Sequence, residues 1–379
     1  MSLKRTYDKI DNKKSINIDD LDLFNLLKNR NVYLIFDKIN NKIKNQYLPM
    51  LCCHENMIDI IKNNLDKFTN ISCWINMCNL ESINAIRLIA DNVHKLTIEC
   101  WMELCSNEAA IPILETHIDI IIKIGCLPQL CLNKNAIHLI KKYIYLMCED
   151  CWINLCFNVN AIDIIKNNLD KMTHKDCWEI LCSNINAIDD IILNNLDKLT
   201  NRCWLILCKN PNAIELLKKN PEKINKDACF ELCTNPNPDI CDILEEHIDS
   251  MTDDLDCWYD LTENYYNNPS PKLLNFIEKH SDKIDYSDWL NSIWASPYAM
   301  TYIEKNISNL DNNDYLYMLC TNKNAIHIIE QILNEMDAHC WERFCSNINA
   351  IPIILNNLDK LNTEAWKTLS TNPNIIHYL

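Results

Sequence analysis

The sequence predicts an all-α fold, an α-solenoid of about 14 two-helix repeats with a period near 26 residues. An apolar residue, most often tryptophan, returns at that interval, and the apolar residues around it follow helical rather than alternating spacing. The chain has one glycine, Gly125, which disfavours the tight turns of open β-structure. The recurring position is held by Leu23, Leu48, Trp74, Trp101, Leu127, Trp152, Trp178, Trp204, Cys229, Trp258, Leu290, Leu316, Trp341 and Trp366.

Each repeat is predicted to begin with a helix that carries the recurring position. In residues 177–182, a Cys-Trp and a Leu-Cys pair lie at offsets 0, 1, 4 and 5, which cover one helical face of about 140°. We expect that face to be buried, and a preceding threonine to act as the N-cap. The predicted N-caps are Thr97, Thr200 and Thr173, the last with Asp176 in a capping box.

A second helix is predicted after each Asn-x-Asn or Asn-Pro-Asn. In residues 161–169 the apolar side chains lie at offsets 0, 1, 4 and 8, again on one helical face. Asn210 and Pro211 fit an N-cap followed by proline at the first helical position. Several second helices end in Asn-Asn-Leu-Asp-Lys, where asparagine is expected in the left-handed conformation because glycine is almost absent.

No linker or change of composition divides the chain. We therefore expect one continuous helical-repeat array over 21–379, irregular at about 258–300 where the period lengthens. Residues 1–20 are expected to be a poorly ordered N-terminal lead-in. The chain closes in mid-pattern after Trp366, without a polar capping helix, so the C-terminal face is expected to contact a partner or a second copy.

Eighteen of the 22 cysteines lie either directly before the recurring position or four residues after it. Both positions belong to the predicted buried face, where free cysteine acts as a small hydrophobe beside tryptophan. Ala365 and Ser370 fill these two positions around Trp366, where a ligand role would require cysteine. We therefore expect packed, reduced thiols and no metal or cofactor.

The alternative roles of cysteine are metal binding and catalysis. Cys148 and Cys151 form a single CxxC, without the second pair that a structural zinc site needs. Cys52, Cys53 and His54 are adjacent but have no evident fourth ligand. A nucleophile is also disfavoured, because a thiol within a packing ladder is buried and inert.

The composition argues against several classes of function. A net charge of −16 opposes general binding to nucleic acid or to anionic membranes. No apolar run is long enough to span a membrane and no signal peptide is evident, so a secreted protein is not expected. Phosphate-loop, nucleophile-elbow and HExxH motifs are absent, so we do not expect an enzyme. Three histidines share a variable repeat position and are expected on the surface: His138, His327 and His377.

Four segments carry a recognisable pattern: NPNAI at 210–214, NPNII at 372–376, NAIHLI at 135–140 and NNLDK at 167–171. They resemble a helical repeat found in proteins of large DNA viruses of amoebae, which carry a similar cycle of Trp, Leu, NPNAI and LDK. The resemblance begins near Leu21 and covers nearly the whole chain, which departs from the family in its many cysteines. It implies a stacked-helix protein without shared catalytic residues, located in the host cytoplasm at the viral factory or in the virion.

The pattern favours a non-enzymatic protein–protein interaction scaffold, in which variable surface residues are presented on a fixed frame. A structural virion or viral-factory component that self-assembles is the alternative. A solenoid that reads nucleic acid one unit per base is a third hypothesis, opposed by the acidic charge and by the lack of a recurring basic position.

Aromatic residues gather where the period breaks, and we expect partner binding there because tyrosine and tryptophan dominate many interfaces. Tyr265 and Tyr266 lie in the insertion and are the preferred contact residues, whereas Trp294 replaces a buried-face cysteine and is expected in the core. The alternative is that a distorted repeat needs bulky side chains to fill its gaps. The candidate set is Tyr259, Tyr265, Tyr266, Tyr286, Trp289, Tyr298 and Tyr302.

Overall fold

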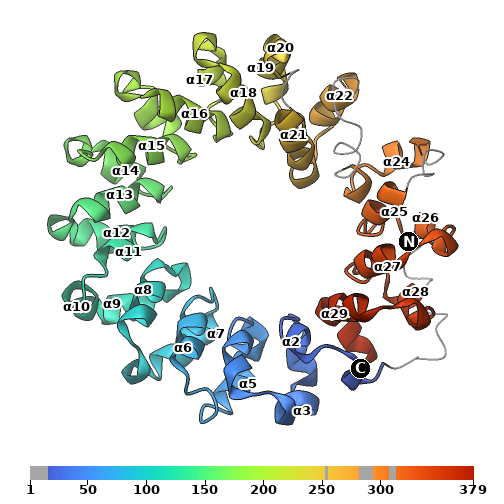
Figure 1. Ribbon diagram of the computed structural model, residues 1–379. Helices are drawn as coiled ribbons and strands as arrows, with labels where there is room; N and C mark the ends of the chain where they lie inside the picture. The colour runs from blue at the N-terminus through green and yellow to red at the C-terminus, as the bar shows by residue number, and fades with distance from the viewer. Residues whose placement is uncertain (1–15, 252–254, 281–292, 307–312) are drawn as a thin grey trace. The chain divides into compact units, whose positions relative to one another are not determined.

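The computed structural model describes residues 16–251, 255–280, 293–306 and 313–379, and every regular element within those ranges is helical (Figure 1). The predicted all-α class is therefore confirmed. The chain divides into two compact units, and the sequence indicated neither boundary. Unit 1 combines residues 1–69 with 290–379, and unit 2 consists of residues 70–289.

The helices of unit 2 are short, and most single helical turns between them are of the 3₁₀ type. In chain order they are α6 (Ile71–Cys78), α7 (Ile83–Ala90), η6 (Val93–Lys95), α8 (Ile98–Ser106), η7 (Glu108–Ala110), α9 (Ile111–Thr116), α10 (Ile118–Lys123), α11 (Leu127–Leu132), α12 (Ile137–Lys142), η8 (Ile144–Leu146), α13 (Glu149–Phe157), α14 (Ile162–Lys166), η9 (Leu169–Lys171), α15 (Lys175–Ser183), the π-helical η10 (Ile188–Ile192), η11 (Leu196–Lys198), α16 (Asn201–Lys209), α17 (Ile214–Lys218), η12 (Pro221–Lys223), α18 (Lys226–Cys233), α19 (Ile240–Glu246), α20 (Ile248–Met251), α21 (Leu255–Asn267) and α22 (Pro271–Lys279).

Unit 1 takes its helices from both ends of the chain. The N-terminal ones are η1 (Ile18–Asp20), α2 (Leu23–Leu26), η2 (Val32–Ile35), α3 (Phe36–Ile39), η3 (Asn40–Lys42), η4 (Asn45–Tyr47), α4 (Leu48–Leu51), η5 (Glu55–Met57) and α5 (Ile58–Lys62). The C-terminal ones are α24 (Met300–Asn306), α25 (Asn313–Leu319), α26 (Ile326–Ile329), η15 (Leu333–Glu335), α27 (Ala338–Phe344), α28 (Ile351–Leu355), η16 (Leu358–Lys360), α29 (Thr363–Thr371) and η17 (Ile375–Tyr378).

The helices that carry the recurring position pack on one another in chain order. In unit 2, α6 contacts α8, and contacts continue through α11, α13, α15, α16 and α18 to α21; in unit 1, α25 contacts α27 and α27 contacts α29. The faces that meet are those predicted from the spacing, as in α16, where Cys203, Trp204, Leu207 and Cys208 are all buried. Packing of this face supplies the stability that such short helices lack on their own.

The cysteines are free thiols, and 20 of the 22 are buried, as expected for a packing role. The thiol four residues after the recurring position contacts the thiol directly before that position in the next repeat. These pairs are Cys78 with Cys100, Cys105 with Cys126, Cys131 with Cys151, Cys156 with Cys177, Cys182 with Cys203, Cys233 with Cys257, and Cys320 with Cys340.

In most repeats, a buried asparagine six residues after the recurring position joins the repeat to the one before it, whereas His54, Leu80 and Ser296 occupy this position in three others. The Asn158 amide donates to the carbonyl oxygens of Cys131 at 2.9 Å and Asn133 at 3.0 Å, and its Oδ1 accepts from the Asn160 backbone N–H at 3.0 Å. The two carbonyls lie at the C-terminal end of α11, where a helix leaves such groups without an internal partner. The asparagines in this role are Asn107, Asn133, Asn158, Asn184, Asn210, Asn235, Asn264, Asn322, Asn347 and Asn372.

The predicted N-cap role of these asparagines is wrong. Asn210 is the C-cap residue of α16, and α17 begins at Ile214 after Ala213. The Asn210 Oδ1 accepts from the backbone N–H of Asn212, two residues on, at 3.0 Å. This short turn frees the Asn210 amide to donate to the Cys182 carbonyl oxygen at 2.9 Å.

The prediction that asparagines adopt the left-handed conformation is also wrong, because Gly125 alone among the described residues has a positive φ, of 77°. Asn168 ends α14 differently, by donating its side-chain amide to the Ile164 carbonyl oxygen at 2.8 Å. Only one of the three predicted threonine N-caps is observed. Thr200 accepts from the Cys203 N–H as predicted, Thr97 accepts no such bond, and His174 rather than Thr173 caps α15.

In unit 1 the N-terminal segment packs on the C-terminal repeat as one repeat packs on the next. Helix α2 contacts α29, and the Asn29 amide donates to the carbonyl oxygens of Ser370 at 3.4 Å and Asn372 at 2.8 Å. The Ile16 N–H donates to the Tyr378 carbonyl oxygen at 3.1 Å. The face that the sequence left open is thus covered by the chain's own N-terminal segment, including residues 16–20 of the expected lead-in.

Candidate functional site

The preferred contact residues of the sequence analysis lie on α21, which at 13 residues is longer than its counterparts. The insertion does not loop out but continues the helix past Asn264. Tyr265 therefore falls on the same face as Trp258 and Leu261, at helical spacing, and is 2 % exposed. Its selection as a contact residue was wrong. Tyr259 and Tyr266, seven residues apart, lie together on the exposed face of α21.

The other candidates do not extend this pair into one described site. Tyr286 and Trp289 lie outside the described residues. Tyr298 is exposed and Tyr302 half-buried, but both belong to unit 1, whereas α21 belongs to unit 2. The core prediction for Trp294 is confirmed, since its ring is fully buried and stacks on Tyr315 with centroids 5.5 Å apart.

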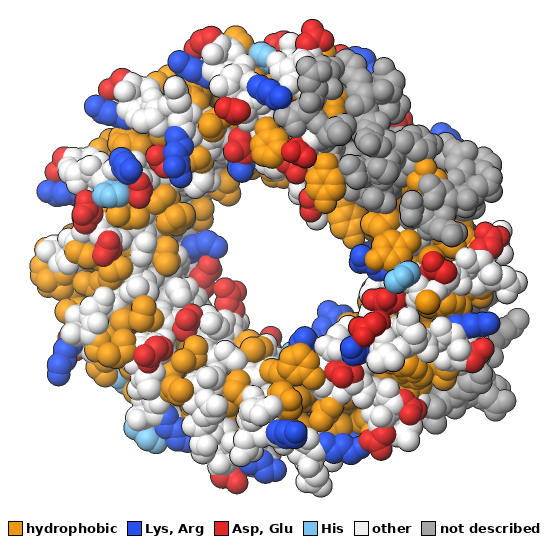
Figure 2. Space-filling model, viewed as in Figure 1, with side chains coloured by type: hydrophobic (Ala, Val, Ile, Leu, Met, Phe, Trp, Pro, Cys, Tyr) orange, Lys and Arg blue, Asp and Glu red, His pale blue; other side chains and the backbone are white. Residues whose placement is uncertain are grey.

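A larger candidate site, which the sequence did not indicate, is a cleft of about 890 Å³ between α7 and α9, here called the α7/α9 cleft. Ile86 and Ile113 form its apolar walls, and Ile83 at the rim is 65 % exposed. Ala90 and Pro112 line the cleft with short side chains, and Arg87 and Glu108 are among its charged lining residues. Figure 2 shows hydrophobic side chains reaching the surface over the neighbouring helices of unit 2 as well.

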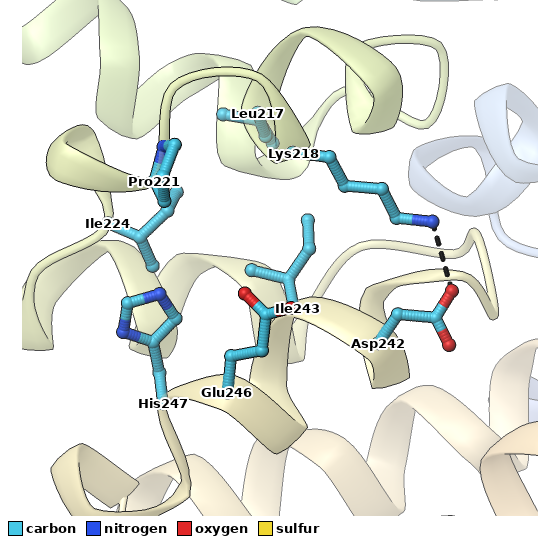
Figure 3. Close-up of a pocket in the computed structure, with 8 residues that line it drawn as sticks. All are labelled: Leu217, Lys218, Pro221, Ile224, Asp242, Ile243, Glu246 and His247. Carbon is cyan, nitrogen blue, oxygen red and sulfur yellow. Dashed lines mark hydrogen bonds and ion pairs between the residues drawn. The ribbon is translucent and has the colours of Figure 1, made fainter.

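A smaller cleft of about 290 Å³ lies between α17 and α19 (Figure 3). Leu217 and Ile243 are among its apolar residues, and the Lys218 side chain crosses its rim to Asp242, with Nζ and Oδ2 2.9 Å apart. Lys272 approaches the other oxygen of the same carboxylate at 2.7 Å. Hydrogen bonds from Lys272 and then Lys218 hold the pKa of Asp242 below its usual value, and the bond to Asp242 raises the pKa of Lys218.

The two clefts share part of their lining positions in two different repeats. Ala90 corresponds to Lys218 in the Asn-Ala-Ile alignment, and Pro112 corresponds to Asp242 in the alignment of His117 with His247. A lysine and an aspartate thus cover one cleft, where an alanine and a proline leave the other open. The signal for the open cleft is therefore the absence of long side chains at two surface positions, which periodicity alone does not show.

The pKa values of several described thiols are shifted from the ordinary value, some upward and some downward. Burial and the neighbouring thiol raise the pKa of Cys105, and burial raises that of Cys241 to about 12, so these thiols are poor nucleophiles. No group of three or more potential ligands is placed to hold a metal ion within the described part of the chain. His54, weighed as a ligand, bonds through Nε2 to the Leu27 carbonyl oxygen at 2.9 Å. His138, His327 and His377 are exposed, as predicted.

Comparisons with protein-family models, with curated proteins and with solved structures give no match to this chain. None of the described helices is both long and apolar enough to cross a membrane.

Proposed function

We propose that the protein is a non-enzymatic protein–protein interaction scaffold, an α-solenoid of about 14 two-helix repeats. The α7/α9 cleft is the observation that carries the proposal. It offers apolar walls at Ile86 and Ile113 and an exposed Ile83 at its rim, the surroundings that an apolar side chain of a partner segment prefers. The buried Asn and Cys positions recur in most repeats of this frame, while the exposed positions differ from repeat to repeat.

The smaller cleft between α17 and α19 suggests a test, because the Lys218–Asp242 ion pair crosses its rim and no such pair of described residues crosses the α7/α9 cleft. A double variant, Ala90→Lys with Pro112→Asp, places the Lys218–Asp242 pair of the smaller cleft across the larger one. We expect capture of protein partners from a host-cell lysate to fall by more than about tenfold, or roughly 1.4 kcal/mol. The helical circular dichroism should be unchanged, since both positions lie at the surface opening.

A pair of single variants provides the matched control. Ile83 and Ile185 both lie two residues before the Ala-Ile pair of their repeats, and both are exposed, but only Ile83 lines the α7/α9 cleft. Ile83→Ser should reduce capture and Ile185→Ser should not. If the same proteins bind all variants equally, the cleft is not the binding site and the proposal loses its support.

The alternative, a self-assembling structural component, draws on the junction inside unit 1. The bonds of Asn29 to Ser370 and Asn372 repeat those between successive repeats, so the N-terminal segment of one copy could bind the C-terminal repeat of another. Light scattering at rising protein concentration tests this idea. Oligomers that disappear in an Asn29→Ala, Asn31→Ala variant would favour assembly, and a monomer at all concentrations would reject it.

A viral origin and a place in the host-cell factory or the virion rest on the sequence resemblance. They are part of the proposal, and labelling of infected amoebae with an antibody to the chain tests them. Signal confined to structures other than factories and virions would contradict them.

A further inference from the structure

Cys148 and Cys151 begin helix α13, and their sulfur atoms lie 3.5 Å apart. Cys148 is the N-cap residue and is exposed, whereas Cys151 is the third residue of this nine-residue helix and is buried. The sulfurs are therefore already in contact across the first helical turn. A small movement would bring them to the bond length of a disulfide, about 2.05 Å.

Cys151 also contacts Cys131 of the preceding repeat, so three thiols follow one another from the surface inward. Other repeats carry threonine where this one carries Cys148. The Thr97 hydroxyl contacts the Cys100 sulfur at 3.7 Å, and the Thr200 hydroxyl contacts the Cys203 sulfur at 3.4 Å. At α13 the hydroxyl is thus replaced by a second thiol that solvent can reach.

The surroundings favour reaction at this pair. The pKa of the Cys151 thiol is lowered, first by its hydrogen bond with the Cys131 thiol and then by hydrogen bonds with the backbone and the thiol of Cys148. The start of a helix also stabilises a thiolate through its free N–H groups. Burial, and then the charge of Asp150, oppose this lowering of the pKa, and Glu149 adds a second negative charge to the first turn.

We propose that Cys148 and Cys151 form a reversible redox site, in which hydrogen peroxide or a small-molecule disulfide converts the two thiols into an intramolecular disulfide. With peroxide, the exposed Cys148 sulfur attacks one oxygen, the O–O bond breaks, and the departing hydroxide takes the proton of the Cys148 thiol to become water. The Cys151 thiol then attacks the resulting sulfenic acid, the S–O bond breaks, and a second water leaves with the thiol proton. The thiols lose two electrons and two protons, and the peroxide is reduced to two waters. With a small-molecule disulfide, the Cys148 sulfur displaces one thiol to form a mixed disulfide, and the Cys151 sulfur then displaces the second. The oxidant leaves as two thiols that carry the two protons.

The test uses the full-length chain, reduced and then exposed to graded hydrogen peroxide or glutathione disulfide. Remaining thiols are alkylated in denaturant, and the tryptic peptide 143–166 is sequenced by mass spectrometry. We expect an internal Cys148–Cys151 disulfide that dithiothreitol reverses, while Cys156 in the same peptide is alkylated. Cys148→Thr, which copies the arrangement at Thr97 and Thr200, should reduce disulfide in this peptide by more than about tenfold. Its circular dichroism should match that of the unchanged protein.

A gain of function provides the converse variant. Thr200→Cys places a thiol beside Cys203 in the same geometry, so a second disulfide should form there under the same conditions. The exposed Cys53 reports that the oxidant has acted. The proposal is overturned if Cys53 is oxidised while both α13 thiols remain alkylatable. It is equally overturned if Cys148 stops at a mixed disulfide or sulfinic acid, or if either thiol links to Cys131.

Discussion

The side-chain amide of Asn29 donates to the carbonyl oxygen of Asn372, 343 positions later in the sequence, at 2.8 Å. Both asparagines are buried and both stand six residues after the recurring position of their repeats. The N-terminal segment therefore packs on the C-terminal repeat in the way that each repeat packs on the one before it.

The first prediction concerns this bond. Asn29→Ala removes the donor to the carbonyl oxygens of Ser370 and Asn372, and a buried carbonyl without a donor costs about 1–3 kcal/mol. We expect urea unfolding at lower concentration and faster proteolysis within the N-terminal segment. Asn25→Ala is the control, because the Asn25 side chain bonds the exposed Lys28, and its effect should stay within about 0.5 kcal/mol. Equal effects of the two variants would contradict the role given to Asn29.

The second prediction separates the two asparagines of one Asn-x-Asn. Asn158 is 1 % exposed and donates to two carbonyl oxygens, whereas the exposed Asn160 amide donates only to the Lys134 carbonyl oxygen at 3.1 Å. Asn158→Ala should cost about 2–3 kcal/mol and Asn160→Ala less than about 1 kcal/mol. Chemical denaturation of both variants measures the difference. A larger loss at Asn160 would show that the outer amide, not the buried one, holds the repeats together.

The third prediction compares adjacent tyrosines on α21. Tyr265→Ala empties a buried position and should cost on the order of 3 kcal/mol. Tyr266→Ala removes an exposed ring and should change stability by less than about 0.5 kcal/mol. Thermal unfolding measures both. If Tyr266→Ala also lowers partner capture while its melting temperature is unchanged, the exposed face of α21 contributes to binding, and unchanged capture would remove it from the candidate site.

The fourth prediction concerns alkaline pH. Burial raises the pKa of Cys208 and of Cys345 to about 12, whereas a thiol in the unfolded chain ionises near about 8.5. The unfolded state therefore loses protons first, so stability is fully present below pH ~8.5 and falls as the pH rises toward 12. Well above pH ~8.5, each such thiol lowers the free energy of unfolding by about 1.4 kcal/mol per pH unit.

Urea unfolding between neutral and strongly alkaline pH, with reductant present, measures this slope. Cys208→Ala should make the slope shallower by the contribution of one thiol, because alanine does not titrate. An identical slope in the variant would mean that the thiol at position 208 ionises equally in both states.

The fifth prediction is that chelator and reductant together leave the helical circular dichroism unchanged, because all the cysteines are free thiols and 20 of the 22 are buried in packing contacts. Loss of helix on adding chelator, or a metal bound near one equivalent, would contradict it.

The buried faces could be predicted from the sequence because they depend on spacing alone. Cys203, Trp204, Leu207 and Cys208 lie within six residues, and a helix brings them together whatever the rest of the chain does. The hydrogen bonds by which the buried asparagines join successive repeats, here called the asparagine ladder, could not be predicted in this way. An asparagine before a helix fits an N-cap equally well, and the carbonyl that Asn210 binds belongs to Cys182, 28 residues earlier.

The site was harder to predict for two reasons. The extra residues after Asn264 could have formed a loop or extended the helix, and only extension places Tyr265 beside Trp258 on the buried face. The α7/α9 cleft depends on the short side chains of Ala90 and Pro112, and short side chains at two exposed positions leave no periodic signal in the sequence.

The asparagine ladder has a consequence for how such a chain can change over generations. Its side-chain amides donate to main-chain carbonyl oxygens, which every residue has. These hydrogen bonds therefore do not depend on which side chain the accepting residue carries. The residue between the two asparagines is accordingly Lys134, Val159, Ile185, Pro211 or Lys323 in different copies, while the bond to the neighbour persists. A duplicated or deleted copy would therefore fit its new neighbour without any compensating substitution. Unequal recombination within the gene could then lengthen or shorten the protein in whole units.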